Sequence, residues 1–214
     1  MGLLQESGIV RGDDTLAFGI FEGLFPSFFE VKYNKPVDYI KIYWDAYIVY
    51  RNKSVLNEQQ QRGVNGKIFE YILATLLIRE DILPIFLSSK VAFVPNISYD
   101  LMLYSTDRGP ICLSAKTSFR ERYKQADLEA IALKYVHRRS LCFLLTLTEK
   151  DAKDVNKKQS IGDVIGLDKA IFVLSDDFND LIDELKKFNL TESPNVNIIE
   201  STQIITLNKV NSVL

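Results

Sequence analysis

Residues 111–130, with the sequence ICLSAKTSFRERYKQADLEA, change from an apolar run to a charged segment within a few positions. The first part, ICLSAKT, predicts a buried strand, and Lys116 is the first charge, placed where that strand ends. A helix is predicted over 120–139 because apolar residues recur there at helical spacing. A strand followed by a helix, with charge gathered at their junction, indicates an α/β fold that carries a polar site at the end of the strand.

The segments around this stretch alternate between strand and helix patterns. Residues 97–105, ISYDLMLYS, predict a strand that pairs with 111–117 as a hairpin across the turn TDRGP. Helices are expected at 63–84 and 176–188, and a helix is favoured over a strand at 37–56. The remaining strands are predicted at 91–95, 140–148 and 169–175, and once or twice within 195–208. This order predicts a mixed central β-sheet flanked by helices.

Composition places the chain among cytoplasmic globular proteins. Its 214 residues are 47% hydrophobic and 25% charged, with a formal net charge of −2, which suits one domain with a sizeable core. Cys112 and Cys142 lie in apolar runs and are expected to be buried thiols of a reducing compartment. His137 is the lone histidine, which argues against a histidine triad or metal site. No apolar stretch reaches membrane-spanning length and no signal peptide is apparent, so we expect no membrane association.

Polar residues from several segments are predicted to meet at one edge of the sheet. Side chains alternate between the faces of a strand, so Ser114 and Lys116 share a face, and the hairpin brings Asp100 toward them. Glu129 on the following helix and Glu70 on the earlier helix are placed to approach the same edge. Ser114 is interpreted as a spacer rather than a nucleophile, because no histidine is near it in the sequence to activate it.

Acids and a lysine in one pocket suit the hydrolysis of phosphodiester bonds. Carboxylates hold Mg²⁺, a hard ion that prefers oxygen ligands. The metal polarises the phosphoryl oxygen and lowers the pKa of a bound water. A lysine orients the attacking water and offsets the negative charge of the transition state. The predicted site therefore has the groups that a metal-dependent nuclease needs.

Asp100 followed by Ser114-Ala115-Lys116 resembles the PD-(D/E)XK nuclease motif, with Ser114 where the pattern has Asp or Glu. Residues 116–125, KTSFRERYKQ, are similar to the K-x-[ST]-x-x-[DE]-R-[WY]-x-Q run of the EcoRII, SsoII and NgoMIV-type restriction endonucleases. Some restriction endonucleases with this departure take the missing acid from the following helix, which here implies Glu129. The resemblance is dense over 111–130 and thin elsewhere.

The resemblance implies a type II restriction endonuclease with a restriction endonuclease-like core and one nuclease domain over 1–214. Residues 63–175 would be the catalytic core, and residues 1–60 an aromatic, helical part that makes a dimer or DNA contact. The substrate implied is double-stranded DNA at a short palindromic CCGG- or CCNGG-like site. A twofold site implies a homodimer, or a higher oligomer. A companion DNA methyltransferase is expected in the host, though not as a binding partner.

The resemblance also implies a role for each residue of the predicted site. Asp100 and Glu129 would bind Mg²⁺, for which Mn²⁺ substitutes. Lys116 would position the attacking water, and Glu70 would tune a second metal or its waters. Asp127 and Glu121 are rivals of Glu129 for the position of the second acid.

Base reading is assigned to the charged run after the strand. Arginine bonds bidentately to guanine and glutamate accepts from cytosine, so Arg120, Glu121 and Arg122 suit two neighbouring G·C pairs. Gln60, in a run of three glutamines, is a candidate for the central base pair in the minor groove. The alternative for the Arg-Glu-Arg run is ordinary surface pairing on a helix, which contributes little stability.

Three other functions stay open from the sequence. A repair or structure-specific nuclease on the same core would cut without needing CC/GG. A catalytically inactive DNA-binding module follows if the serine at position 114 has removed an essential acid. A plain α/β binding protein with no DNA role would leave the Arg-Glu-Arg run unexplained.

Overall fold

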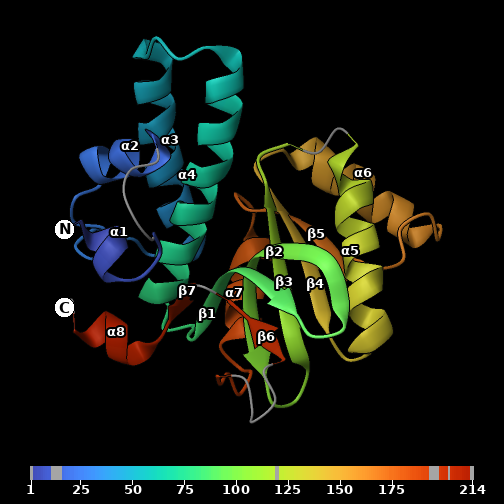
Figure 1. Ribbon diagram of the computed structural model, residues 1–214. Helices are drawn as coiled ribbons and strands as arrows, with labels where there is room; N and C mark the ends of the chain where they lie inside the picture. The colour runs from blue at the N-terminus through green and yellow to red at the C-terminus, as the bar shows by residue number, and fades with distance from the viewer. Residues whose placement is uncertain (1, 11–15, 119–120, 193–197, 202, 213–214) are drawn as a thin grey trace.

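The computed structural model describes residues 2–10, 16–118, 121–192, 198–201 and 203–212, and these residues form a mixed α/β fold around a seven-stranded sheet (Figure 1). The strand order is β5-β4-β3-β2-β1-β6, and β7 also pairs with β1. The strands are β1 (Ile85–Val91), β2 (Val94–Ser105), β3 (Gly109–Lys116), β4 (Leu141–Thr146), β5 (Lys169–Phe172), β6 (Ile199–Glu200) and β7 (Gln203–Ile205). The predicted mixed sheet flanked by helices is confirmed.

The direction of each strand follows from its connection. A short turn with Gly109 at a positive φ of 77° joins β2 to β3, so the two pair antiparallel, as the predicted hairpin requires. Helical crossovers join β3 to β4 and β4 to β5, and these pairs are parallel. Strands β6 and β7 pair antiparallel with β1. Strand β3 lies between β2 and β4, so its carboxyl end is in the middle of the sheet, and α5 begins a few residues later.

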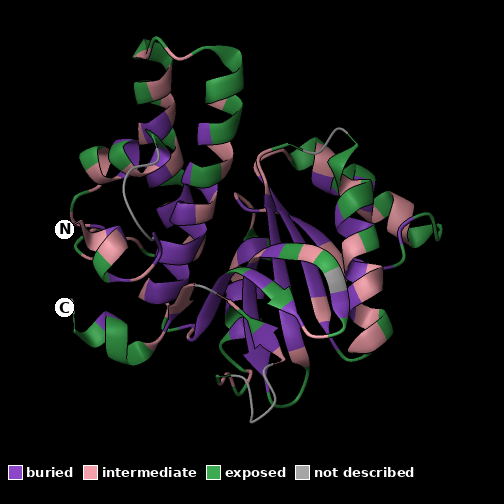
Figure 2. Ribbon diagram, viewed as in Figure 1, coloured by how far each residue is buried: buried purple, intermediate pink, exposed green. Residues whose placement is uncertain are grey.

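Helices cover both faces of the sheet. The helices are α1 (Leu3–Glu6), α2 (Leu16–Leu24), α3 (Pro36–Lys53), α4 (Glu58–Arg79), α5 (Arg122–Val136), α6 (Glu149–Ser160), α7 (Asp176–Leu185) and α8 (Leu207–Asn211). On one face α4 packs on β2 and β3 and α7 packs on β5, and on the other α5 and α6 pack on β2, β4 and β5. Figure 2 shows that the strands are largely buried between these layers, whereas the α3–α4 connection is exposed.

The helix on which Glu70 lies differs in its bounds from the sequence prediction of 63–84. It begins earlier, at Glu58, because the side chains of Asn57 and Gln60 cap it reciprocally: Asn57 Oδ1 accepts from the Gln60 amide at 2.9 Å, and Gln60 Oε1 accepts from the Asn57 amide at 3.1 Å. It ends at Arg79, and Asp81 at φ 57° turns the chain away from the helix.

The strand predicted at 91–95 is wrong in position. The strand before β2 is β1, at Ile85–Val91, and residues 92 and 93 form the turn between the two. Phe93, counted as a strand residue by its β propensity, is at φ 63° and 83% exposed in that turn. Turn geometry therefore outweighed side-chain preference here.

The aromatic N-terminal part packs on α4. Buried rings of α2 and α3 stack against one another, with Phe21 and Tyr43 6.1 Å apart and Tyr39 and Tyr43 4.3 Å apart between ring centroids. Phe21 also meets Tyr71 of α4 edge-on at 5.8 Å. This aromatic layer packs α2 and α3 onto α4. Among the described helices none is long and apolar enough to cross a membrane.

Candidate active site

Asp100 and Lys116 form an ion pair where β2 and β3 stop pairing. The last paired residues there are Leu101 and Leu113, so Asp100 and Lys116 both lie beyond the end of the ladder. Lys116 Nζ is 2.7 Å from Asp100 Oδ2, and the same oxygen accepts from the amide of Ala115 at 3.1 Å. Both side chains are about one-fifth to one-quarter exposed, at 22% and 24%. The predicted approach of these two residues is thus found, with the carboxylate held by a main-chain and a side-chain donor.

Ser114 lies between these two residues in the motif but points into the packed interior. It is 5% exposed, and its hydroxyl is 3.8 Å from Cys112 Sγ. Burial raises the pKa of the Cys112 thiol well above its usual value, so the thiol stays neutral. A small hydroxyl fits this space, in keeping with its interpretation as a spacer, and β3 supplies no second carboxylate.

Glu129 lies on α5, the helix that packs beside the end of β2 that carries Asp100. The hydroxyl of Tyr99, the residue before Asp100, donates to the main-chain oxygen of Glu129 at 3.1 Å and so ties the helix to β2. Gln125 Nε2 donates to Glu129 Oε1 at 2.8 Å. Burial raises the pKa of Glu129; Gln125 and the charge of Lys116 oppose this, and the charge of Asp100 adds to it. Glu129 is therefore within electrostatic reach of both residues.

Asp127, the rival acid on the same helix, is used differently. It is 8% exposed, and its carboxylate accepts from the amides of Ile165, Gly166 and Leu167, the shortest contact being 2.7 Å to Gly166. A side chain at Gly166 would meet the main-chain oxygen of Asp127 at 2.4 Å, so glycine is needed for this close approach. Asp127 holds the segment before β5 and does not face the corner formed by Asp100 and Lys116. Glu121, the other rival, is exposed and bonded to Lys124.

Glu70 approaches from α4, on the opposite face of the sheet from α5. Its side chain is 21% exposed, and Lys67 Nζ is 2.7 Å from its Oε2. Burial raises the pKa of Glu70; the charge of Lys67 opposes the shift, and the nearby charge of Asp100 adds to it. Lys67 was not among the predicted site residues. Its position three residues before Glu70 on a helix is the signal that identifies it as a partner.

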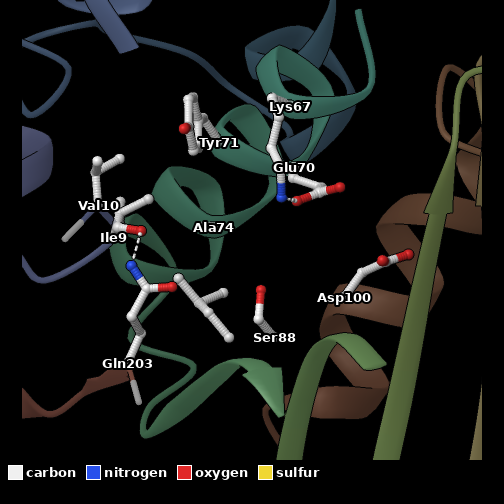
Figure 3. Close-up of a pocket in the computed structure, with 10 residues that line it drawn as sticks. Ile9, Val10, Lys67, Glu70, Tyr71, Ala74, Ser88, Asp100 and Gln203 are labelled. Carbon is white, nitrogen blue, oxygen red and sulfur yellow. Dashed lines mark hydrogen bonds and ion pairs between the residues drawn. The ribbon is translucent and has the colours of Figure 1, made fainter. Parts of the chain in front are cut away.

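A pocket of about 160 Å³ opens beside this group (Figure 3). Lys67 and Glu70 enter it from α4, and Asp100 borders it from β2. Ser88, at φ 46° in β1, lies on its floor, and Gln203 of β7 closes it by donating to the main-chain oxygen of Ile9 at 3.0 Å. The pocket therefore borders two of the predicted acids and the lysine that accompanies one of them.

A divalent cation at this site would need oxygen ligands from the protein's acidic side chains. Within the described residues no three Asp, Glu, His or Cys side chains gather closely enough to hold a metal by themselves. Mg²⁺, however, is usually held by one or two carboxylates, with waters and substrate phosphates completing the shell. Among the described residues, the hydrogen bonds to Asp100 reach Oδ2 and the one to Glu129 reaches Oε1, which leaves a second oxygen of each acid for a cation. Asp100 and Glu129 thus each offer an oxygen donor of the kind that Mg²⁺ prefers.

Three of the four predicted base-reading residues, Glu121, Arg122 and Gln60, lie at or near the starts of helices. Glu121 is the N-cap of α5 and is 83% exposed in its side chain, with Lys124 Nζ at 3.3 Å, and Arg122 is the exposed first residue of the helix. Arg120 lies outside the described residues. Gln60 is exposed near the start of α4, where its side-chain oxygen is engaged in the helix cap. The starts of α4 and α5 both lie toward the top of Figure 1.

Comparison with known proteins gives a single structural likeness to report. No protein-family model matches the chain, and no curated protein matches it in sequence. A solved structure described as a complex of the restriction endonuclease PspGI with substrate DNA is similar, with 18% sequence identity and a TM-score of 0.48. The similarity covers 83% of this chain and 74% of that one.

Proposed function

We propose that this chain is a type II restriction endonuclease. It hydrolyses both strands of double-stranded DNA at a short palindromic site that contains CC/GG, of the CCGG or CCNGG kind. The observation that carries the proposal is the Asp100–Lys116 ion pair at the end of β3, with Glu129 on α5 within electrostatic reach of both residues. This arrangement supports the nuclease motif predicted from the sequence, including a second acid that comes from the helix.

The chemistry proposed divides among three residues. Asp100 and Glu129 hold Mg²⁺, or Mn²⁺ in its place, and the ion supplies Lewis-acid polarisation of the phosphate and activation of water. Asp100 is held in one orientation because Lys116 and the Ala115 amide both donate to it. Lys116 hydrogen-bonds the water that attacks phosphorus and balances the charge that develops on the phosphoryl oxygens. The water oxygen forms a bond to phosphorus and gives its proton to solvent, while the bond from phosphorus to one ester oxygen breaks and that oxygen leaves with a proton from solvent.

Recognition is assigned to the start of α5. Glu121 and Arg122 are exposed there, a few residues beyond Lys116. If the start of α5 enters the major groove, Lys116 would lie near the DNA backbone. We propose that Glu121 accepts from cytosine and that Arg120 and Arg122 bond guanines. Gln60 is proposed to contact the central base pair. A homodimer, in the cytoplasm of a host with a matching methyltransferase, accounts for a twofold site.

The proposal is tested by incubating the purified protein and Mg²⁺ with plasmids that carry mapped CCGG and CCNGG sites. Discrete fragments whose ends map to one of these sites are expected. Cutting at unrelated positions or at branched junctions would instead identify a repair or structure-specific nuclease. Because β3 carries Ser114 and no second acid, a catalytically inactive module is the other candidate, and it would bind the DNA without cutting it in Mg²⁺ or Mn²⁺.

A further inference from the structure

The ion pair between Lys67 and Glu70 differs from the other helical pairs of this protein. In three comparable pairs at i,i+3 or i,i+4 spacing the acid is largely exposed: 89% for Glu58, 83% for Glu121 and 59% for Glu149. Such pairs contribute little, because water screens them. Glu70 is 21% exposed, although its spacing from Lys67 is ordinary. Because the Glu70 carboxylate is partly shielded from water and lies near other charges, its pairing with Lys67 needs a different explanation from that of the exposed pairs.

Each acid at the proposed reaction centre has its own holding partner. Asp100 is held by Lys116 and a main-chain amide, and Glu129 is held by Gln125. Among the described residues, Lys67 is the side chain that hydrogen-bonds Glu70. Lys67 is also within electrostatic reach of Asp100. Without the lysine, the Glu70 carboxylate would lie partly buried beside the negative charge of Asp100, and repulsion would favour its rotation toward solvent.

We infer that Lys67 is a positioning residue of the proposed nuclease, which holds the Glu70 carboxylate beside the Asp100–Lys116 pair. This inference rests on the proposed function and adds a residue that the sequence motif does not contain. In this inference Lys67 acts through Glu70, whose carboxylate its ammonium group contacts at 2.7 Å, and a direct contact with DNA is the alternative that the binding experiment below tests. Figure 3 shows both side chains leaving α4 on the side of the pocket that faces Asp100.

The test is a double-mutant cycle on single-turnover cleavage of a duplex that carries the site cut by the wild-type protein. The cycle compares wild type, Lys67→Met, Glu70→Gln and the double variant. Lys67→Met is expected to slow cleavage about 10–100-fold, as loss of a partner behind a metal-site residue usually does. The double variant should be no slower than Glu70→Gln alone, and Lys67→Arg should restore most of the rate. Lys153→Met, which removes an exposed helical pair on α6, is the matched control and should cut at the wild-type rate.

Binding of the same duplex without metal gives a second readout. The Lys67–Glu70 pair carries no net charge, so the double variant should bind as tightly as wild type. A direct phosphate contact by Lys67 would instead weaken binding and lower the salt dependence by about one ion. Rate losses that multiply in the double variant, or a Lys67→Met protein as fast as wild type, would overturn the inference alone. A wild-type protein that cuts no DNA would overturn the proposed function and this inference together.

Discussion

Asp127 and Glu129 lie on opposite sides of α5 and have different partners. Asp127 is 8% exposed and accepts from main-chain amides before β5. Glu129, two residues later, is half-buried and is held by the side-chain amide of Gln125. Residues two positions apart on a helix point about 200° apart, so Asp127 faces the backbone before β5 whereas Glu129 points elsewhere, within electrostatic reach of Asp100 and Lys116.

The difference lies in the kind of partner and not in the kind of residue. Main-chain amides are fixed, and they hold the Asp127 carboxylate in a position where it is only 8% exposed and shielded from a ligand. A single glutamine leaves one oxygen of Glu129 for a cation and lets the carboxylate adjust. The structural acid should therefore matter for stability, and the proposed functional acid should matter for cleavage.

The largest effect is expected from Glu129→Gln. Loss of this charge should reduce cleavage by at least about 10²-fold, because a metal ligand is removed. Stability should be unchanged or slightly higher, since burial already disfavours the ionised form. Single-turnover rates and thermal unfolding measure the two effects. A fully active Glu129→Gln protein would mean that another residue supplies the second acid.

The opposite behaviour is expected of Asp127→Ala. It leaves the amides of Ile165, Gly166 and Leu167 without their acceptor, and each unsatisfied buried donor costs about 1–3 kcal/mol. We expect a loss of about 3 kcal/mol or more in the free energy of unfolding, measured with urea. Asp127→Asn, which keeps one acceptor oxygen, should lose less. An Asp127→Asn protein that folds normally but cuts no DNA would reverse the roles of the two acids.

A smaller and more selective effect is expected at the exposed start of the helix. Arg122→Ala should cost roughly 1–3 kcal/mol of discrimination at one base pair, without a change in fold. Relative cleavage of duplexes with each single substitution in the site measures this. Lys150→Ala, an exposed cation in the first turn of α6, is the control. Equal losses on all duplexes would show that Arg122 contacts phosphate rather than a base.

The smallest effect concerns pH. The pKa values of Glu70 and Glu129 are both raised, chiefly by burial, so the folded protein binds protons that the unfolded chain has already lost. Stability should therefore fall as pH rises from the usual glutamate range through these raised values. Cleavage should rise over the same interval, because cation binding needs the ionised acids. Parallel profiles of unfolding and cleavage measure this, and cleavage that already levels off at the ordinary pKa of glutamate would contradict it.

Local sequence patterns predict the strands correctly where standard turns connect them. The hairpin of β2 and β3 follows from its turn sequence, and it places Asp100 near Lys116. Two features of the structure could not be predicted so directly from the sequence. The start of α4 was obscured by Gly63 and Gly66, although Asn57 and Gln60 form its cap. The choice between Asp127 and Glu129 depends on which way α5 is turned, and packing against β2 sets that orientation.

The most direct test of the account is to compare Lys116→Ala with the wild-type protein on a duplex containing the mapped site, in Mg²⁺ and at the same bound fraction. Lys116 lies on β3 and not on α5, and the proposed chemistry depends on it most. We predict that the variant binds the duplex as the wild type does but fails to cut it. Cleavage by Lys116→Ala at the wild-type rate would contradict the assignment of this corner as the active site.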